Sequence, residues 1–254
     1  MVVYFQKPAS FMSKPFLLFF IILFFSISGV SQDKSTLTME LLKPYKAVYK
    51  SKIKGIDILF ERQLSLKDNG NLELRLQGKK FIFQVSEISI FSLVEKTITP
   101  ISYKAIVAGG ITRRKEIEFD SSAREINSLS KKQWFKLPYE DGVLDRLSVQ
   151  EQLRLLLIAN RNIPKRISFR VADGSRIKDY KFLFAGEETL QANIGDIKTI
   201  RFTREFKDPN RLDTVWLAPD LDFLMIKHVH KEKGKSNQAI LLEASMEGFG
   251  KIKT

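Results

Sequence analysis

The chain has 254 residues, of which 44% are hydrophobic and 28% are charged, and its formal net charge at pH 7 is +13. This composition fits one large β-rich domain or a modest two-domain protein, and it argues against long disordered segments. The chain has no cysteine, which excludes disulfide bonds, cysteine zinc sites, thiol nucleophiles and a lipid-modified cysteine.

The N-terminal segment has the order of a secretory signal peptide. Lys7 and Lys14 precede the apolar run Phe16–Phe25, and the small and polar stretch "SISGVSQD" follows. This run is shorter than the roughly 20 apolar residues that a spanning helix needs. We expect a signal peptide over residues 1–30, a flexible lead-in over residues 31–44 and export to the periplasm. An uncleaved inner-membrane anchor stays open as the alternative.

The positive charge persists without the leader, because removing its two lysines still leaves a formal charge of +11. An exported basic protein points to anionic envelope surfaces as partners, such as lipid headgroups, lipopolysaccharide or cell-wall polymers. Nucleic acid is a poor candidate, because export removes the chain from it. Ordinary solubility charge is the alternative interpretation.

From residue 45 to residue 250 the dominant hydrophobic period is two, which is typical of strands. Ile56, Ile58 and Phe60 share one face of such a strand, and "DNGN" supplies a turn before the alternating stretch "LELRLQ". This pattern predicts a hairpin. Further hairpins are predicted around Gly109-Gly110, Asp173-Gly174, Gly195 and Gly234. Repeated strands and turns predict one antiparallel meander domain.

One segment, "DRLSVQEQLRLLLIANRN", has helical spacing instead. Ser148 and Glu151 have the spacing of a capping box, so we predict an amphipathic helix over Ser148–Ala159. Its apolar stripe is expected to pack on the sheet, with a membrane-surface or partner-binding helix as the alternative. The stripe consists of Leu147, Leu153, Leu156 and Leu157.

A long antiparallel sheet has two open edges, which are an aggregation hazard. We therefore expect a mainly β fold in which a strongly curved antiparallel sheet, or half-open barrel, carries one amphipathic helix on its concave side. A closed β-barrel is the alternative.

His228 and His230 are the two histidines of the chain, and their spacing in a strand places both rings on one face. They are weak candidates for a metal site, because no third or fourth ligand is identified. We expect no metal and no cofactor, and a pair of exposed rings beside a hairpin tip is the other interpretation.

Asp213, Asp220 and Asp222 form an acidic cluster in the sequence. Two carboxylates at a fixed separation could act as acid and base on a glycoside. The structural interpretation is a turn, in which Pro219 fixes φ and Asp220 bonds its own backbone. No G-x-S-x-G elbow or glycine-rich phosphate loop is present, so catalysis has no positive signal.

The same region predicts a structural corner. We expect Trp216 to pack into the core, a tight corner to follow, and Leu221–Val229 to run as a strand paired with "QAILLEASM". The residues of this motif are Arg211, Trp216, Ala218, Pro219 and Asp220.

The chain resembles a family of exported proteins of Gram-negative bacteria that is classed as a domain of unknown function. The matching stretches include "LLKPYKAVYKSKIKG", "DGVLDRLSVQEQLR", "DYKFLFAGEETLQANIGDIKTIRFTRE" and "RLDTVWLAPDLDFLMIKHVHKEKG". They extend from about Pro44 to Glu243, and the Trp-Leu-Ala-Pro-Asp core is the most specific of them. The resemblance implies an exported, mostly β domain without assigned catalytic residues.

Three functions remain in competition. The first is a non-enzymatic cell-envelope protein that binds a lipid-like or amphiphilic ligand in its curved sheet, which export, basic charge and the concave face favour. The second is a scaffold or interaction module with a protein partner in envelope assembly. The third is a hydrolase of envelope polymers that uses Asp213, Asp220 and Asp222.

Overall fold

The computed structural model describes residues 42–253, apart from residues 54, 110–111, 161 and 193–194. They belong to the compact unit Asp33–Thr254. The predicted signal peptide and most of the predicted lead-in lie outside the described residues. None of the helices in the described part of the chain has the length and apolar character needed to cross a membrane.

One sixteen-stranded sheet makes up most of the unit, and its strands follow the period-two alternation of the sequence. Buried and exposed residues alternate from Asp57 to Leu64, for example, so one face of this strand meets the core. The strands are β1 (Tyr45–Ile53), β2 (Ile56–Leu66), β3 (Leu72–Lys80), β4 (Phe83–Val94), β5 (Thr97–Ala108), β6 (Arg113–Asp120), β7 (Glu125–Ser130), β8 (Gln133–Pro138), β9 (Val143–Leu144), β10 (Arg166–Ala172), β11 (Ile177–Ala192), β12 (Gly195–Arg204), β13 (Leu212–Ala218), β14 (Leu224–Glu232), β15 (Lys235–Met246) and β16 (Gly250–Lys253).

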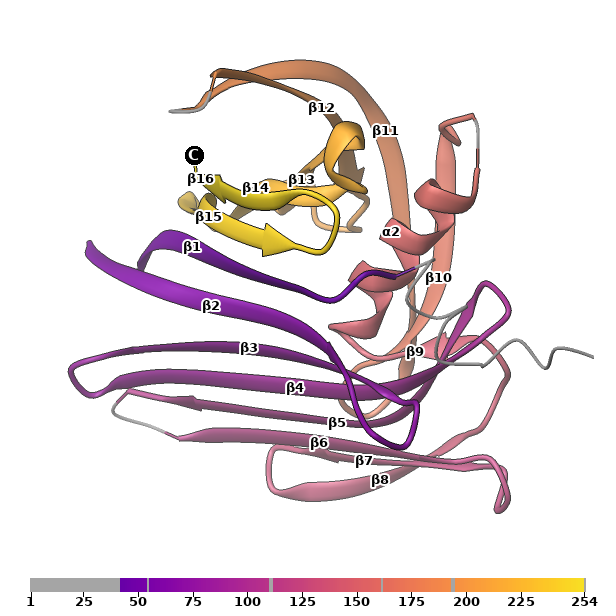
Figure 1. Cartoon of the computed structure of the whole chain (residues 1–254). Coiled ribbons are helices and arrows are strands. Elements are labelled where there is room, and N and C mark those ends of the chain that lie inside the picture. Colours follow the sequence, from indigo (N-terminus) through magenta and orange to yellow (C-terminus); the bar gives the residue numbers. More distant parts are fainter. Residues whose placement is uncertain (1–41, 54, 110–111, 161, 193–194, 254) are drawn as a thin grey trace, which may run out of the picture. The chain divides into compact units, whose positions relative to one another are not determined.

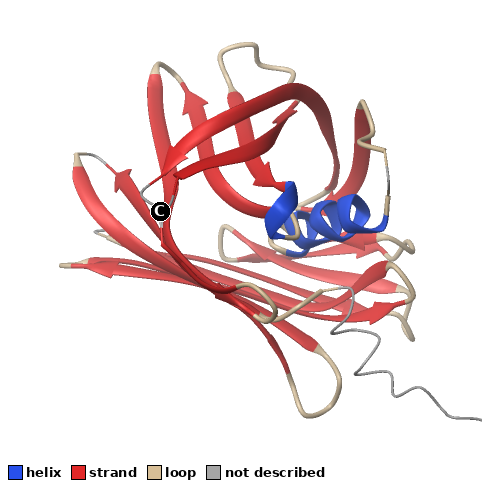
Figure 2. Ribbon diagram, turned by 45° about the horizontal axis from the view of Figure 1, so that its top comes forward, coloured by secondary structure: helices blue, strands red, loops and turns tan. Residues whose placement is uncertain are grey.

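The sheet consists of two antiparallel meanders, β1–β8 and β10–β15, which the antiparallel pair β1–β15 joins. Strand β9 pairs with β10 in parallel, and β16 pairs with β15. The strands curve strongly (Figures 1 and 2), and the path through the described strands ends at β8 and β9 without closing. The predicted half-open, curved sheet is confirmed, and the alternative of a closed barrel is wrong.

Both edges are short, which limits pairing with other chains. Strand β9 has two residues, and β8 has six, among them Lys136 and Pro138. A lysine charge and a proline that lacks an N–H both disfavour the addition of another strand. These features protect the two end strands of the sheet.

Helix α2 (Ser148–Ala159) has the predicted bounds and lies on the concave side of the sheet (Figure 2). The side chain of Gln152 ties it to the turn between β4 and β5. Its amide oxygen accepts a hydrogen bond from the N–H of Ile98 at 2.7 Å, and its amide nitrogen donates to the carbonyl of Lys96 at 3.2 Å. The apolar residues that the helix buries are Val149, Leu153, Leu155 and Leu157.

The start of α2 corrects the predicted capping box of Ser148 and Glu151. The carboxylate of Asp145 accepts hydrogen bonds from the N–H groups of Leu147 at 2.8 Å and Ser148 at 2.9 Å. The N–H of Asp145 in turn donates to the hydroxyl of Ser148 at 2.9 Å. This reciprocal pattern is a capping box formed three residues earlier than predicted. Glu151 does not cap the helix, because its carboxylate is occupied by buried ion pairs.

Glu151 is 1% exposed and lies at the centre of a buried polar network. Its carboxylate accepts hydrogen bonds from the hydroxyl of Tyr45 at 2.7 Å, from Arg62 at 2.9 Å and from Arg154 at 3.1 Å. Arg154 also donates to the carbonyl of Asp222 at 2.7 Å. The network thus connects α2 with β1, with β2 and with the turn before β14.

The predicted hairpin turns are confirmed where the structure describes them. The turns at residues 68–71, at Asp173-Gly174 and at Gly234 each join two neighbouring strands. The strands predicted around Gly109-Gly110 and Gly195 also pair, but residues 110–111 and 193–194 lie outside the described part of the chain.

The hairpin of β7 and β8 is one that the sequence pattern did not predict. Its turn is Lys131-Lys132, in which both residues have positive φ, 52° and 65°. Glycine or asparagine usually occupies such positions, because they tolerate positive φ. A lysine pair lacks that signal.

Strand β14 pairs with β15 as predicted, but it begins at Leu224 rather than at Leu221. Residues Pro219–Leu221 form a single 3-10 turn. The N–H of Phe223 then donates to the carbonyl of Ala218 at 2.8 Å. The corner is therefore longer than the sequence pattern indicated, because the chain continues to turn after the proline.

Replacement of Glu151 tests the buried network. In Glu151→Gln the neutral amide leaves the guanidinium groups of Arg62 and Arg154 buried without a counter-charge, so we expect a loss of about 3–5 kcal/mol in the free energy of unfolding. Urea denaturation measures it. The control is Glu61→Gln on β2, whose carboxylate pairs with Lys46 at the surface and should contribute at most about 1 kcal/mol. Equal losses in the two variants would contradict the conclusion that Glu151 stabilises the fold as the buried counter-charge of Arg62 and Arg154.

The same carboxylate predicts a pH dependence. Burial opposes the ionisation of Glu151, but Arg154 and Arg62 outweigh it and hold its pKa below the ordinary value of 4.5. A lowered pKa means that the carboxylate stabilises the fold above that ordinary value and that this stabilisation is lost as the pH falls through the folded pKa. Between pH 7 and pH 3, the unfolding free energy should fall more in the wild type than in Glu151→Gln.

Candidate functional site

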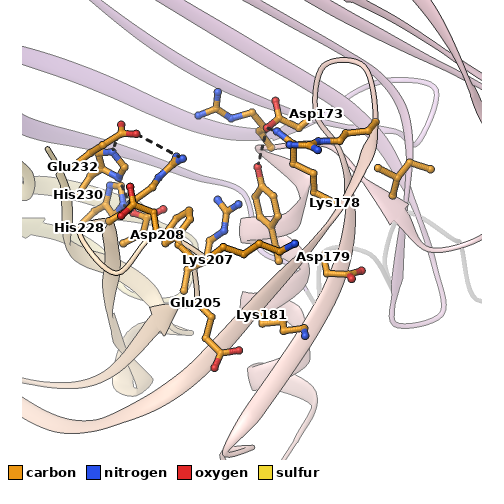
Figure 3. Close-up of a pocket in the computed structure, with 18 of the residues that line it drawn as sticks. Asp173, Lys178, Asp179, Lys181, Glu205, Lys207, Asp208, His228, His230 and Glu232 are labelled. Carbon is orange, nitrogen blue, oxygen red and sulfur yellow. Dashed lines mark hydrogen bonds and ion pairs between the residues drawn. The ribbon is translucent and has the colours of Figure 1, made fainter.

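A cavity of about 1100 Å³ lies between β11, the segment after β12 and the end of β14 (Figure 3). Its wall carries eight cationic and six acidic side chains, together with both histidines. The excess of positive charge favours an anion over a cation in this space. The cationic residues are Lys115, Arg146, Arg176, Lys178, Lys181, Arg204, Lys207 and Arg211.

The turn between β10 and β11 forms one wall because it is fastened to the first meander. Asp173 pairs with Lys115 of β6 at 2.9 Å and with Lys178 of β11 at 2.6 Å. The hydroxyl of Ser128 donates to the carbonyl of Gly174 at 2.7 Å. Burial opposes the ionisation of Asp173, but the two lysines outweigh it and lower its pKa far below the ordinary value. The wall therefore keeps its ion pairs at neutral pH.

Two arginines and two aromatic rings form a stack in this cavity, which we call the Arg204–Arg211 stack. The guanidinium of Arg204 lies over the rings of Tyr180 and, at 4.5 Å, Phe206, and that of Arg211 lies 4.3 Å from the Phe206 ring centre. Stacking holds a guanidinium in place while its edge stays available for hydrogen bonds. The rings thus orient two cations toward the same space.

The stack leaves buried hydrogen-bond donors without partners. The Nε atoms of Arg204 and Arg211 are buried, and neither has a hydrogen-bond partner among the described residues. Burial also lowers the pKa of Arg204, which means that its charge is incompletely solvated. Such an arginine gains most from an anionic group that accepts from its guanidinium.

The histidines lie on the cavity wall in a chain of polar contacts. Asp213 of β13 contacts the Nε2 of His228 and lies 3.7 Å from the Nδ1 of His230. The Nε2 of His230 lies 3.5 Å from Glu232. The rings share one face, as predicted, but they are partly buried rather than fully exposed. No group of three or more histidine, aspartate or glutamate residues in the described part of the chain could hold a metal ion.

A second cavity, of about 280 Å³, lies beside the first toward the helix. The two share Arg146, Tyr180, Arg204, Asp213 and His228, so the charged space and the inner space are adjacent. Half of the inner lining is apolar, and the rest includes the charged residues Arg62 and Glu87. Its apolar members are Tyr49, Phe60, Leu76, Leu147, Val149, Phe182, Val215, Met225 and Ala239.

The acidic cluster of the sequence is not brought together. Asp213 faces the cavity, whereas Asp222 pairs with Lys43 at 3.2 Å and Asp220 is exposed in the corner. Strand β13 separates Asp213 from the other two, and its seven residues extend over about 20 Å. Paired glycosidase carboxylates lie about 5–10 Å apart, so Asp213 does not form such a pair.

Most of the residues predicted to form the corner motif lie away from the cavity. Trp216 is 8% exposed but lies outside the hydrophobic core cluster; its indole N–H donates to Glu188 at 2.8 Å, and Lys227 covers its ring at 4.6 Å. Ala218 is fully buried. Pro219 begins the 3-10 turn and Asp220 is exposed. Of this motif only Arg211 reaches the cavity.

Sequence reasoning missed Arg146, Tyr180, Arg204 and Phe206. Arg204 did carry a signal, because Ile200, Phe202 and Arg204 follow the alternation of β12 and the first two are in the core. A cation at the core-facing position of a strand indicates a polar cavity or an ion pair. Arg146, Tyr180 and Phe206 reach the cavity only through the way in which the segment after β12 and the two meanders pack together, and no local spacing of residues signals this.

Comparison with known proteins gives a family and two solved structures. No curated protein matches the chain. A crystal structure of MucB in complex with MucA(peri) covers 82% of this chain and 92% of its own at 10% identity and a TM-score of 0.17. A Pseudomonas aeruginosa MucA/MucB complex covers 85% and 94% at 9% identity and a TM-score of 0.18. Scores this low do not establish a shared fold.

The family comparison covers most of the described strands. The model of the family described as "Protein of unknown function (DUF3108)" matches residues 32–233, which include the helix, the arginine stack and both histidines. The match extends over far more than half of the chain. The chain therefore belongs to the DUF3108 family.

Proposed function

We propose that the protein is an exported cell-envelope protein that binds an anionic amphiphile in its two adjacent cavities. The apolar part of the ligand occupies the inner cavity beside α2, and its anionic group lies against the Arg204–Arg211 stack. The leader-like N-terminus supports export to the periplasm. The observation that carries the proposal is that a partly apolar space of about 280 Å³ shares five wall residues with a space of about 1100 Å³ whose wall has more cationic than acidic side chains.

The two spaces suit the two parts of one molecule. Ligand cavities are typically lined by apolar side chains with a few polar groups that fix orientation. Here Val149, Val215 and Met225 supply apolar lining, and Arg146 and Arg204 lie where both spaces meet. A carboxylate or phosphate at that junction would accept from cations that the protein leaves without full solvation.

The geometry does not favour hydrolysis of envelope polymers, because Asp213 is separated from Asp220 and Asp222 by the length of β13. The polar chain through the histidines has an acid and a base, but no nucleophile is placed beside it among the described contacts. Ligand binding therefore accounts for the apolar lining and the arginine stack, whereas catalysis accounts for neither.

Parinaric acid, a fluorescent fatty acid, and its uncharged methyl ester test the proposal together. Arg146→Gln removes a cation at the junction of the cavities, so we expect the acid to bind about tenfold more weakly, because a hydrogen bond to a charged group contributes about 1.5–3 kcal/mol. The methyl ester should bind equally to both proteins. Fluorescence titration measures both affinities.

Arg124→Gln is the matched control, since Arg124 lies at the surface and pairs with Asp141 outside the cavities. Val215→Phe fills the inner cavity and should abolish binding of both ligands, whereas Val48→Phe on the opposite face of the sheet should not. If the wild type binds neither ligand, or if Val215→Phe leaves binding unchanged, the proposed function is wrong.

A further inference from the structure

The hairpin of β3 and β4 ends in two exposed apolar residues. Lys80 pairs with Phe83, so Phe81 and Ile82 form a two-residue turn at the tip. Phe81 is 78% exposed and Ile82 is 81% exposed, more than the other large apolar residues of the described chain. Neither side chain takes part in the core, so folding does not account for them.

The turn itself does not require these residues either. Phe81 has a φ of 54°, a conformation that glycine and asparagine adopt more readily than an aromatic residue does. Two-residue hairpin turns favour Asn-Gly for that reason. A phenylalanine here adds backbone strain and exposes an apolar ring to water, and it gains no burial in return. This combination is typical of a residue that is kept for an interaction.

The hairpins β1–β2 and β5–β6 end at the same end of the sheet as the β3–β4 tip, because alternate turns of an antiparallel meander lie at one end of its strands. The ammonium group of Lys80 donates to the carbonyl of Asp57 at the start of β2, at 2.7 Å. Phe83 lies against Gly109 at the end of β5. The ends of the β1–β2, β3–β4 and β5–β6 hairpins thus form one surface.

Exposed cations accompany the apolar pair. We define the tip surface by Phe81, Ile82, Lys52, Lys79, Arg113 and Arg114, all of which are exposed. At the other end of the same strands the turns carry Lys67 beside Asp68 and Glu95 beside Lys96, so the charges cancel there. At the tip end Asp57 pairs with Lys50 and Arg114 pairs with Glu116, so the net positive charge of the tip surface is carried chiefly by Lys52, Lys79 and Arg113.

We infer that the tip surface docks on an anionic lipid membrane, with Phe81 and Ile82 inserted among the lipids and the cations against the headgroups. Apolar side chains flanked by lysine and arginine are the combination that binds such a surface. The inference uses residues outside both cavities, so it stands or fails separately from the proposed ligand.

Co-sedimentation with vesicles tests the inference on the compact unit Asp33–Thr254, which contains all the described strands and their core. We expect binding to phosphatidylcholine vesicles that contain phosphatidylglycerol, and weaker binding to phosphatidylcholine alone. Phe81→Asn/Ile82→Ser should weaken binding about tenfold or more. Asparagine tolerates the positive φ of this turn, so thermal unfolding should show no loss of stability. Lys79→Gln/Arg113→Gln should weaken binding about fivefold for each charge removed.

Val94→Ser is the matched control, because Val94 is 50% exposed at the opposite end of β4, and it should bind vesicles like the wild type. Parinaric acid binding should be unchanged in the tip variants. The inference is overturned if the wild type does not bind anionic vesicles or if Val94→Ser loses as much as the tip variants. It is also overturned if analytical ultracentrifugation shows that the tip instead joins two copies of the chain.

Discussion

The buried carboxylate of Glu151 is the interaction on which the rest of the structure depends. It joins a helix to an open sheet where three parts of the chain meet, namely β1, β2 and the turn before β14, which Arg154 reaches. The two meanders of the open sheet are joined by the β1–β15 pairing, and the ion pair of Asp173 with Lys115 and the hydrogen bond of Ser128 to Gly174 fasten the β10–β11 turn to the first meander. A network of charged and hydrogen-bonded groups that requires all its partners supplies a further constraint, since each unpaired member would be costly.

The cavities are a consequence of this arrangement. One helix of twelve residues covers only part of the concave face, and the strands beyond it curve away from the core. A cavity remains between β11, the segment after β12 and β14, and ion pairs of Asp173 with Lys115 and Lys178 hold the turn of β10 and β11 in its wall. The wall carries more cationic than acidic side chains, which supports the proposed anionic ligand.

The two inferences about function concern different parts of the molecule. The arginine stack lies inside the cavity and depends on desolvation for its strength, whereas the tip surface depends on exposure. A guanidinium whose buried Nε lacks a partner favours one specific anion, and exposed lysines favour a surface with many. The two proposals therefore assign different roles to different parts of the chain's positive charge.

The sequence by itself determined the alternation of many strands, five of the hairpins and the bounds of the helix, because side-chain direction in a strand or helix follows from a period of two or 3.6 residues and needs no partner. It also placed both histidines on one face. Only the tertiary structure decided that Asp145 and not Ser148 begins the capping box, that Trp216 lies beside Glu188 outside the core, and that Arg204, Phe206 and Arg211 stack at a cavity. These contacts depend on strand register, on the curvature of the sheet and on how a loop folds back. None of these is encoded in the spacing of residues within one element.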